Sequence, residues 1–117
     1  MHHKFYGIIA KNPTTIKNGL MYVKTPLKKD TGMLFDMGRL DNHTFWMKNT
    51  YIPLDLIFLN SNFRIIGLKG DNNPLSLKKI GIDKNSRYIL EVNAGSIKSK
   101  NIKIGDYIDF YSMHPPQ

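Results

Sequence analysis

The stretch DLIFLNSNFRIIGLK, Asp55 to Lys69, predicts the clearest β-hairpin of this chain. Two segments rich in β-branched and aromatic residues flank NSN, whose Asn and Ser side chains favour tight turns. Asp55 stands directly before LIFL, and a carboxylate in an apolar strand must be paired or hydrogen-bonded, because burying it alone would cost several kcal/mol. The hairpin therefore predicts a partner for Asp55.

The block before this hairpin is HTFWMKNTYIPLD, residues 43–55. We expect HTFWMK to form another strand, antiparallel to DLIFL, because Pro53 excludes NTYIPL from the middle of a strand. Lys48 would then lie near Asp55 and be its partner. A strand period of two would give the block two faces: Thr44, Trp46 and Lys48 on one, Phe45, Met47 and Asn49 on the other.

The rest of the chain predicts further short strands and two short helices. The strands are expected at residues 4–10, 32–37, 87–92 and 104–111, and the helices within 12–23 and 95–101. Seven or so short strands separated by turns describe a mainly β protein, either a sandwich or a partly open barrel with one or two short helices. We expect a compact single domain over residues 1–117, with the tail 112–117 frayed.

Composition is typical of a soluble globular protein. The 117 residues suit one domain, the apolar fraction is 41% and the mean hydropathy is −0.34. No apolar run approaches the ~20 residues of a membrane-spanning helix, and the N-terminus lacks the pattern of a signal peptide. We therefore expect no membrane span and a cytoplasmic location. The absence of cysteine excludes disulfides, thiolate nucleophiles and cysteine-ligated metals.

The net charge of +8 would attract nucleic acid or other anionic partners. Most of this charge is lysine spread along the chain, and arginine occurs only at residues 39, 64 and 87. Lysine lacks the planar fork with which arginine recognises phosphate, and a genome rich in A and T would also enrich lysine. A nucleic acid or a protein partner on the basic surface therefore stays an alternative.

Common catalytic signatures are missing from the sequence. There is no glycine-rich phosphate loop, no GxSxG elbow and no HExxH motif. His43 alone among the four histidines lies beside the FWMKNT block, and a lone histidine there is more often a turn residue than a metal ligand. We expect neither a metal nor a cofactor.

The chain contains a single glutamate, Glu91, inside the apolar run YILEV. In a functional interpretation, Trp46, Lys48, Asn49, Asp55 and Glu91 line a shallow cleft, where the aromatic face offers stacking and the charges offer orientation. In a structural interpretation, the polar side chains satisfy backbone groups around Pro53, Trp46 fills the core, and Glu91 caps the turn after Ala94. Met21 and Met33 are expected to fill the core, with a pocket wall as the alternative.

Five blocks together resemble the domain-of-unknown-function 192 (DUF192) family. They are GLM at 19–21, GMLF at 32–35, FWMKNT with IPLD over 45–55, YILEVNAG at 88–95 and IGD at 104–106. Their order and spacing agree with the family from about residue 15 to 110. The resemblance implies a compact, mainly β domain of bacteria, archaea and some of their viruses, often exported, with no assigned activity.

The family's signature falls on particular positions of this chain: Trp46, Met47, Lys48, Asn49, Thr50, Pro53, Asp55 and Glu91. The chain departs from the pattern of its relatives in three respects. We expect no export signal, residues 70–86 contain only Pro74 and no cysteine, and Asp36 stands where the family usually has an apolar residue.

These observations predict a non-enzymatic binding or accessory domain with a shallow cleft for a small polar ligand such as a sugar. Trp46 would stack on the ligand, Lys48 would contact an acceptor or anion, and Asp55 and Glu91 would accept hydrogen bonds. One alternative is a hydrolase that uses Asp55 and Glu91 as a carboxylate pair, which requires both carboxyls in one open cleft.

Overall fold

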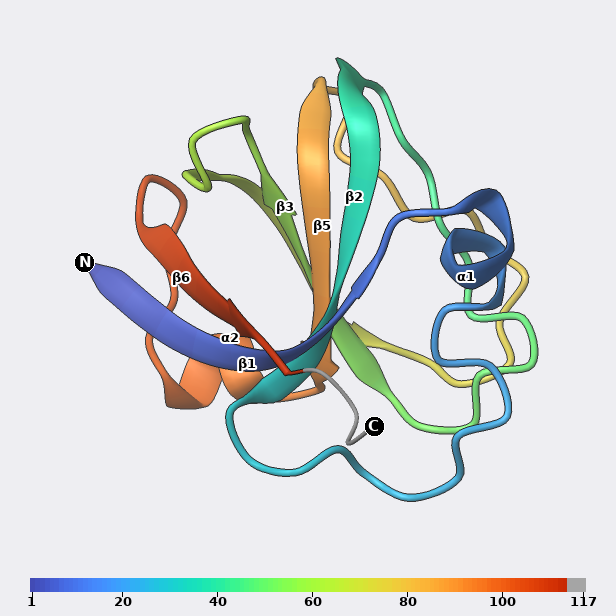
Figure 1. Ribbon diagram of the computed structural model, residues 1–117. Helices are drawn as coiled ribbons and strands as arrows, with labels where there is room; N and C mark the ends of the chain where they lie inside the picture. The colour runs from blue at the N-terminus through green and yellow to red at the C-terminus, as the bar shows by residue number, and fades with distance from the viewer. Residues whose placement is uncertain (114–117) are drawn as a thin grey trace.

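A computed structural model describes residues 1–113, which form six strands and two short helices (Figure 1). In chain order these are β1 (His2–Ala10), α1 (Pro13–Asn18), β2 (Thr31–Asp41), β3 (Leu54–Leu59), β4 (Ile65–Asn72), β5 (Ser86–Asn93), α2 (Ser96–Ser99) and β6 (Tyr107–Ser112). The predicted mainly β fold is confirmed. The tail was expected to fray from residue 112, but Ser112 is the last residue of β6. Residues 114–117 of the tail lie outside the described residues.

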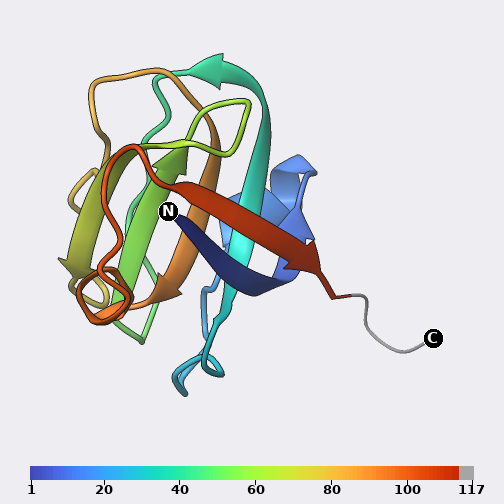
Figure 2. The same cartoon turned by 90° about the vertical axis from the view of Figure 1, so that its left-hand side faces the viewer.

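The six strands form a single curled sheet in the order β4-β3-β5-β2-β1-β6 (Figures 1 and 2). β1 runs parallel to β2 and β6, and the other neighbours are antiparallel. The two ends of the sheet approach each other, because the Ile65 N–H donates to the Asp106 carbonyl at 2.7 Å and the Ile108 N–H to the Phe63 carbonyl at 3.0 Å. The sheet is therefore a partly open barrel, not a sandwich.

Apolar side chains cover both faces of the sheet, and every residue of β3 is buried. The inner cluster includes Leu34, Ile57, Leu59, Leu90 and Val92, together with residues of β1 and β6. The outer cluster includes Phe35, Leu54, Leu56, Phe58 and Ile89, and α1 and the segments 42–53 and 73–85 pack on it. Because β3 is buried on both faces, its one charged residue must be satisfied inside the protein.

The predicted hairpin is confirmed as β3 and β4. Its turn is organised by Asn60, whose side-chain oxygen accepts hydrogen bonds from the Asn62 and Arg64 N–H groups at 2.9 and 3.0 Å. Phe63 adopts a left-handed conformation with φ 64° in this turn. The NSN sequence thus stabilises the turn through the Asn60 side chain, which accepts hydrogen bonds from the following backbone.

The predicted strand HTFWMK was wrong, since this segment does not join the sheet. It forms an isolated bridge between Phe45 and Ile80, and the Met47 N–H donates to the Ser76 carbonyl at 3.0 Å. The physical reason is that β4 and β5 already occupy both edges of β3. The alternation predicted for the segment is seen in the exposure of its residues: Thr44, Trp46 and Lys48 are exposed, Met47 is buried, and Phe45 and Asn49 are half-buried.

Helix α1 is shorter than the predicted segment 12–23. The Asn12 side chain accepts a hydrogen bond from the Thr15 N–H at 2.9 Å and caps its start. Gly19, with φ 48°, ends it. Helix α2 lies within its predicted segment and directly follows Gly95.

The Asp55 carboxylate connects three elements of the fold. Its Oδ1 accepts a hydrogen bond from the Asp71 N–H in β4 at 2.8 Å, and its Oδ2 accepts one from the Ile97 N–H in α2 at 2.9 Å. The predicted partner Lys48 was wrong, because its Nζ lies 5.1 Å from the centroid of the Trp46 ring instead. Asp55 is 1% exposed and serves the fold.

Replacing Asp55 with Ala should destabilise the protein by about 3 kcal/mol or more, because two N–H groups would lose a charged acceptor. Urea unfolding followed by far-UV circular dichroism would measure this loss. The matched control is Asp71→Asn, whose exposed side chain should cost about 0.5 kcal/mol or less. Equal stability of the two variants would contradict the role given to Asp55.

Candidate functional site

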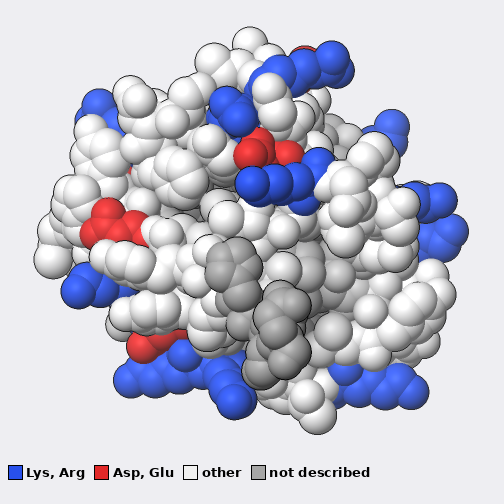
Figure 3. All heavy atoms as spheres, in the orientation of Figure 1, with Lys and Arg blue, Asp and Glu red and all other residues white. Residues whose placement is uncertain are grey.

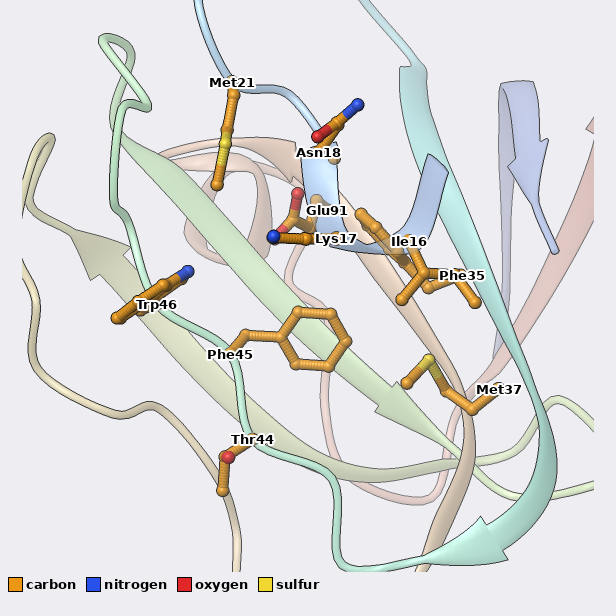
Figure 4. A pocket seen from close by; sticks show the side chains of 11 residues that line it. Ile16, Lys17, Asn18, Met21, Phe35, Met37, Thr44, Phe45, Trp46 and Glu91 are labelled. Carbon is orange, nitrogen blue, oxygen red and sulfur yellow. The ribbon is translucent and has the colours of Figure 1, made fainter. Parts of the chain in front are cut away.

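A pocket opens on the outer face of the sheet, between α1, β2, β5 and the segment 44–46 (Figure 4). Its cavity volume is about 170 Å³. The lining combines apolar and polar side chains: Ile16, Lys17, Asn18, Gly19, Met21, Phe35, Met37, Thr44, Phe45, Trp46 and Glu91. The pocket is small, and polar and apolar groups both contribute to its wall.

Strand register places Glu91 on the pocket side of the sheet. β5 lies between β3 and β2, with Glu91 opposite Leu56 on one side and Met33 on the other. Gly19 brings the chain after α1 close to this carboxyl. A Cβ at residue 19 would lie 3.2 Å from the Phe35 ring and 3.7 Å from Glu91 Oε1, so the glycine allows both the turn and the close approach.

The Glu91 side chain is 5% exposed. Within residues 1–113 its carboxyl accepts or donates no hydrogen bond, and burial raises the pKa of Glu91 to about 8. A carboxyl with this pKa is mostly protonated at neutral pH, so it offers both a hydrogen-bond donor and an acceptor. Figure 4 shows it among the pocket-lining side chains, with Trp46 and Phe45 to one side and Ile16 and Phe35 to the other.

Aromatic rings form a second part of the pocket wall. Trp46 is 44% exposed, although its neighbour Met47 is 1% exposed. Phe45 packs edge-on against Phe35 with ring centroids 5.3 Å apart. Trp46 and Phe45 also line an adjoining hollow of about 220 Å³ with Thr44 and Lys79. The tryptophan therefore stands between two hollows with its ring accessible, a position suited to stacking.

The structure brings only part of the predicted cleft together. Trp46 and Glu91 line the same pocket, and Lys48 does not line it but lies over the Trp46 ring, with Nζ 5.1 Å from the ring centroid. Asn49 donates from Nδ2 to the Tyr22 hydroxyl at 3.1 Å, beside the pocket. Asp55 does not contribute, because it belongs to the other face of the sheet.

The two carboxyls of the predicted hydrolytic pair are on opposite faces of the sheet. Leu56 lies opposite Glu91 in the register of β3 and β5, so the side chains of Leu56 and Glu91 share one face of the sheet. Asp55 is the neighbour of Leu56 in β3, so its side chain points to the other face. The carboxylate-pair alternative requires both groups in one open cleft. This arrangement does not provide that geometry.

Several lining residues were not predicted. Lys17 and Asn18 come from α1, and Phe35 and Met37 come from β2. Met21, expected in the core, lines the pocket instead, while Met33 packs against the outer cluster. Gly19 could have indicated Lys17 and Asn18 from the sequence, because this glycine ends α1 directly after them.

Residues 1–113 hold no group of three or more His, Asp or Glu side chains placed to ligate a metal. Over the same residues no helix is long and apolar enough to cross a membrane.

The fold and pocket define a small, mainly β domain with a curled six-stranded sheet. A family model described as "Uncharacterized ACR", DUF192, matches residues 2–110. The chain belongs to the DUF192 family, which confirms the resemblance seen in the sequence blocks. No curated protein matches it.

Two solved structures are similar to this chain. A putative transcription regulator from Sinorhizobium meliloti 1021 shares 36% identity, with a TM-score of 0.82, over 85% of this chain and 76% of its own. A protein of unknown function from Novosphingobium aromaticivorans DSM 12444 shares 31% identity, with a TM-score of 0.80, over 85% of this chain and 70% of its own. Neither description assigns a ligand.

The Glu91 carboxyl should make stability depend on pH. Its pKa is raised from 4.5 to about 8 in the folded protein, so its contribution to stability is fully present below pH 4.5 and is lost as pH rises to about 8. We expect Glu91→Gln to become more stable relative to the wild type over this range, by roughly 2 kcal/mol or more at pH 8.5. Unfolding of both proteins in urea at several pH values would measure the difference, and a constant difference from pH 4.5 to 8.5 would contradict it.

Proposed function

We propose that this protein binds a small polar ligand, a saccharide, in the pocket between Glu91 and Trp46. One observation carries the proposal: a buried carboxyl without a hydrogen-bond partner among the described residues lines a pocket whose wall includes an accessible tryptophan. The carboxyl opens into the pocket, so a ligand there would supply it with a hydrogen-bond partner.

The pocket suits a ligand of about one ring. Its volume of about 170 Å³ lies below the ~300–1,000 Å³ of sites that hold drug-sized molecules. The Trp46 ring would stack on the apolar face of a sugar, and protonated Glu91 would both donate to and accept from its hydroxyls. Lys17 and Asn18 provide further polar groups from α1. These groups support a saccharide as the ligand.

The arrangement supports binding without catalysis. Most glycoside hydrolases use two carboxyls flanking the scissile bond. Glu91 is the only carboxyl among the residues that line the pocket or the adjoining hollow. The proposal is therefore a binding or accessory domain.

Trp46 is the only tryptophan, so its fluorescence reports on the pocket. We expect emission typical of a partly exposed ring, and a shift of that emission on titration with neutral hexoses and the corresponding uronic acids. Trp46→Ala should weaken binding about tenfold, because a stacked ring contributes roughly 0.5–1.5 kcal/mol beyond its buried area. Isothermal titration calorimetry would measure binding by this variant, which lacks the fluorescent ring.

Glu91→Gln keeps the shape of the side chain and should also weaken binding. The matched control is Tyr111→Ala, which removes an exposed aromatic of β6 with 47% exposure and should leave affinity unchanged. No shift in Trp46 emission and no heat with any of these sugars would count against the proposal. So would equal affinities of Trp46→Ala and Tyr111→Ala.

Nucleic-acid binding is a second candidate, favoured by the net charge of +8 and by the description of the Sinorhizobium meliloti structure as a putative transcription regulator. Figure 3 shows lysines and arginines in separate patches on the face turned to the viewer, without a continuous basic stripe. Binding of a DNA duplex that weakens steeply with added salt would support this candidate. Affinity that does not change with salt would exclude its electrostatic form.

A further inference from the structure

Lysines surround the proposed site. Lys17 lines the pocket, Lys79 lines the adjoining hollow, and Lys48 lies over the ring of Trp46, which lines both. None of the three forms an ion pair within residues 1–113. The only acidic side chain lining either hollow is Glu91, which is mostly uncharged at neutral pH. The charged side chains that line the two hollows are thus mainly lysines, which favours a ligand with negative charge.

Two lysines lie over aromatic rings in the two segments that carry the pocket residues Met21 and Trp46. Lys48 Nζ lies 5.1 Å from the Trp46 ring centroid, and Lys24 Nζ lies 5.5 Å from the Tyr51 ring centroid. Tyr22 packs beside Tyr51 with ring centroids 6.4 Å apart, and it directly follows the pocket-lining Met21. We call Trp46, Lys48, Tyr22, Tyr51 and Lys24 the aromatic strip.

The backbone holds this strip in a strained arrangement. Tyr22 and Asn49 both adopt left-handed conformations, with φ 68° and 55°. They bond to each other twice, from the Tyr22 N–H to the Asn49 carbonyl at 2.7 Å and from Asn49 Nδ2 to the Tyr22 hydroxyl at 3.1 Å.

Core packing does not explain this strain, because Tyr22 is 65% exposed and Tyr51 is 42% exposed. A left-handed tyrosine is a strained conformation, and strained residues are found more often at binding sites than elsewhere.

We infer that the ligand is an acidic oligosaccharide, with one ring in the pocket and the following rings along the aromatic strip. This inference rests on the proposed function. Each unit of such a chain has a ring that can stack and a carboxylate or sulfate that can meet an ammonium group. The repeated pairing of aromatic and lysine matches that repeat.

The strip favours a saccharide over a nucleic acid because it contains lysine and no arginine. Lysine acts as a point charge for a single anion on each ring, whereas phosphate recognition in nucleic acids draws heavily on arginine's planar fork. In the pocket, the protonated Glu91 would accept an anionic ring without charge repulsion and donate a hydrogen bond to it.

The test is a titration with galacturonate oligomers of one to three units, each compared with its uncharged methyl ester. We expect affinity to rise about tenfold from one unit to three, and the esters to bind at least about fivefold more weakly than the acids, because each added ring gains an aromatic and an ammonium contact. Trp46 fluorescence and isothermal titration calorimetry would both measure the affinities.

Variants of the strip separate the two parts of the site. Tyr51→Ala and Lys24→Gln should abolish the gain from chain length and leave binding of the single unit unchanged. Their controls are Tyr111→Ala and Lys4→Gln, both exposed on β6 and β1. A thermal melt of each variant would establish that it is folded.

Each outcome bears on one of the two proposals. Equal binding of acids and esters, no gain with length, or equal behaviour of Tyr51→Ala and Tyr111→Ala would overturn the acidic oligosaccharide while leaving the saccharide pocket intact. Tighter binding of a thymidine oligonucleotide than of the trimer would overturn it in favour of nucleic acid. If neither single sugars nor oligomers bind, the proposed function itself fails.

Discussion

The register of β3 against β5 is the constraint on which the rest of this structure depends. Leu56 lies opposite Glu91 and Asp55 opposite Val92. Because side chains alternate along a strand, this pairing sends Asp55 to one face of the sheet and Glu91 to the other. A slip of one residue would exchange the faces of every side chain in β3, placing its carboxylate in the outer cluster. Both faces of β3 are buried, so such a slip would be strongly unfavourable.

Asp55 and Glu91 both carry buried carboxyls, but within residues 1–113 only Asp55 has hydrogen-bond donors from the backbone. Asp55 accepts one hydrogen bond on each oxygen from the backbone of β4 and α2, so its charge is compensated within the fold. Glu91 has no such donors among the described residues, and burial raises its pKa to about 8. A charged group that is fully satisfied stabilises a structure, whereas a buried group left without a partner costs stability and is found where a ligand can compensate.

The irregular segment 42–53 owes its position to the same sheet. With β4 and β5 on both edges of β3, the segment pairs with residues 76–80 instead and packs on the outer cluster. Met47 anchors it in the core, which leaves Trp46 and Lys48 on the exposed side. The proposed binding surface thus consists of loops on a sheet, an arrangement that positions side chains while leaving them accessible.

Local patterns in the sequence determined much of this protein. Alternating and turn-forming residues predicted β3, β4 and the alternation of residues 44–49, the FWMKNT and IPLD blocks indicated the family, and the unusual positions of Trp46 and Glu91 indicated a site. Only the tertiary structure decided which residues share it. Strand order excluded HTFWMK from the sheet, register separated Asp55 from Glu91, and the end of α1 at Gly19 added Lys17 and Met21. The physical reason is that propensity and periodicity depend on a few residues that are neighbours in sequence. The neighbours of each strand, the sheet face of each side chain and its hydrogen-bond partners depend on contacts between segments far apart in the chain.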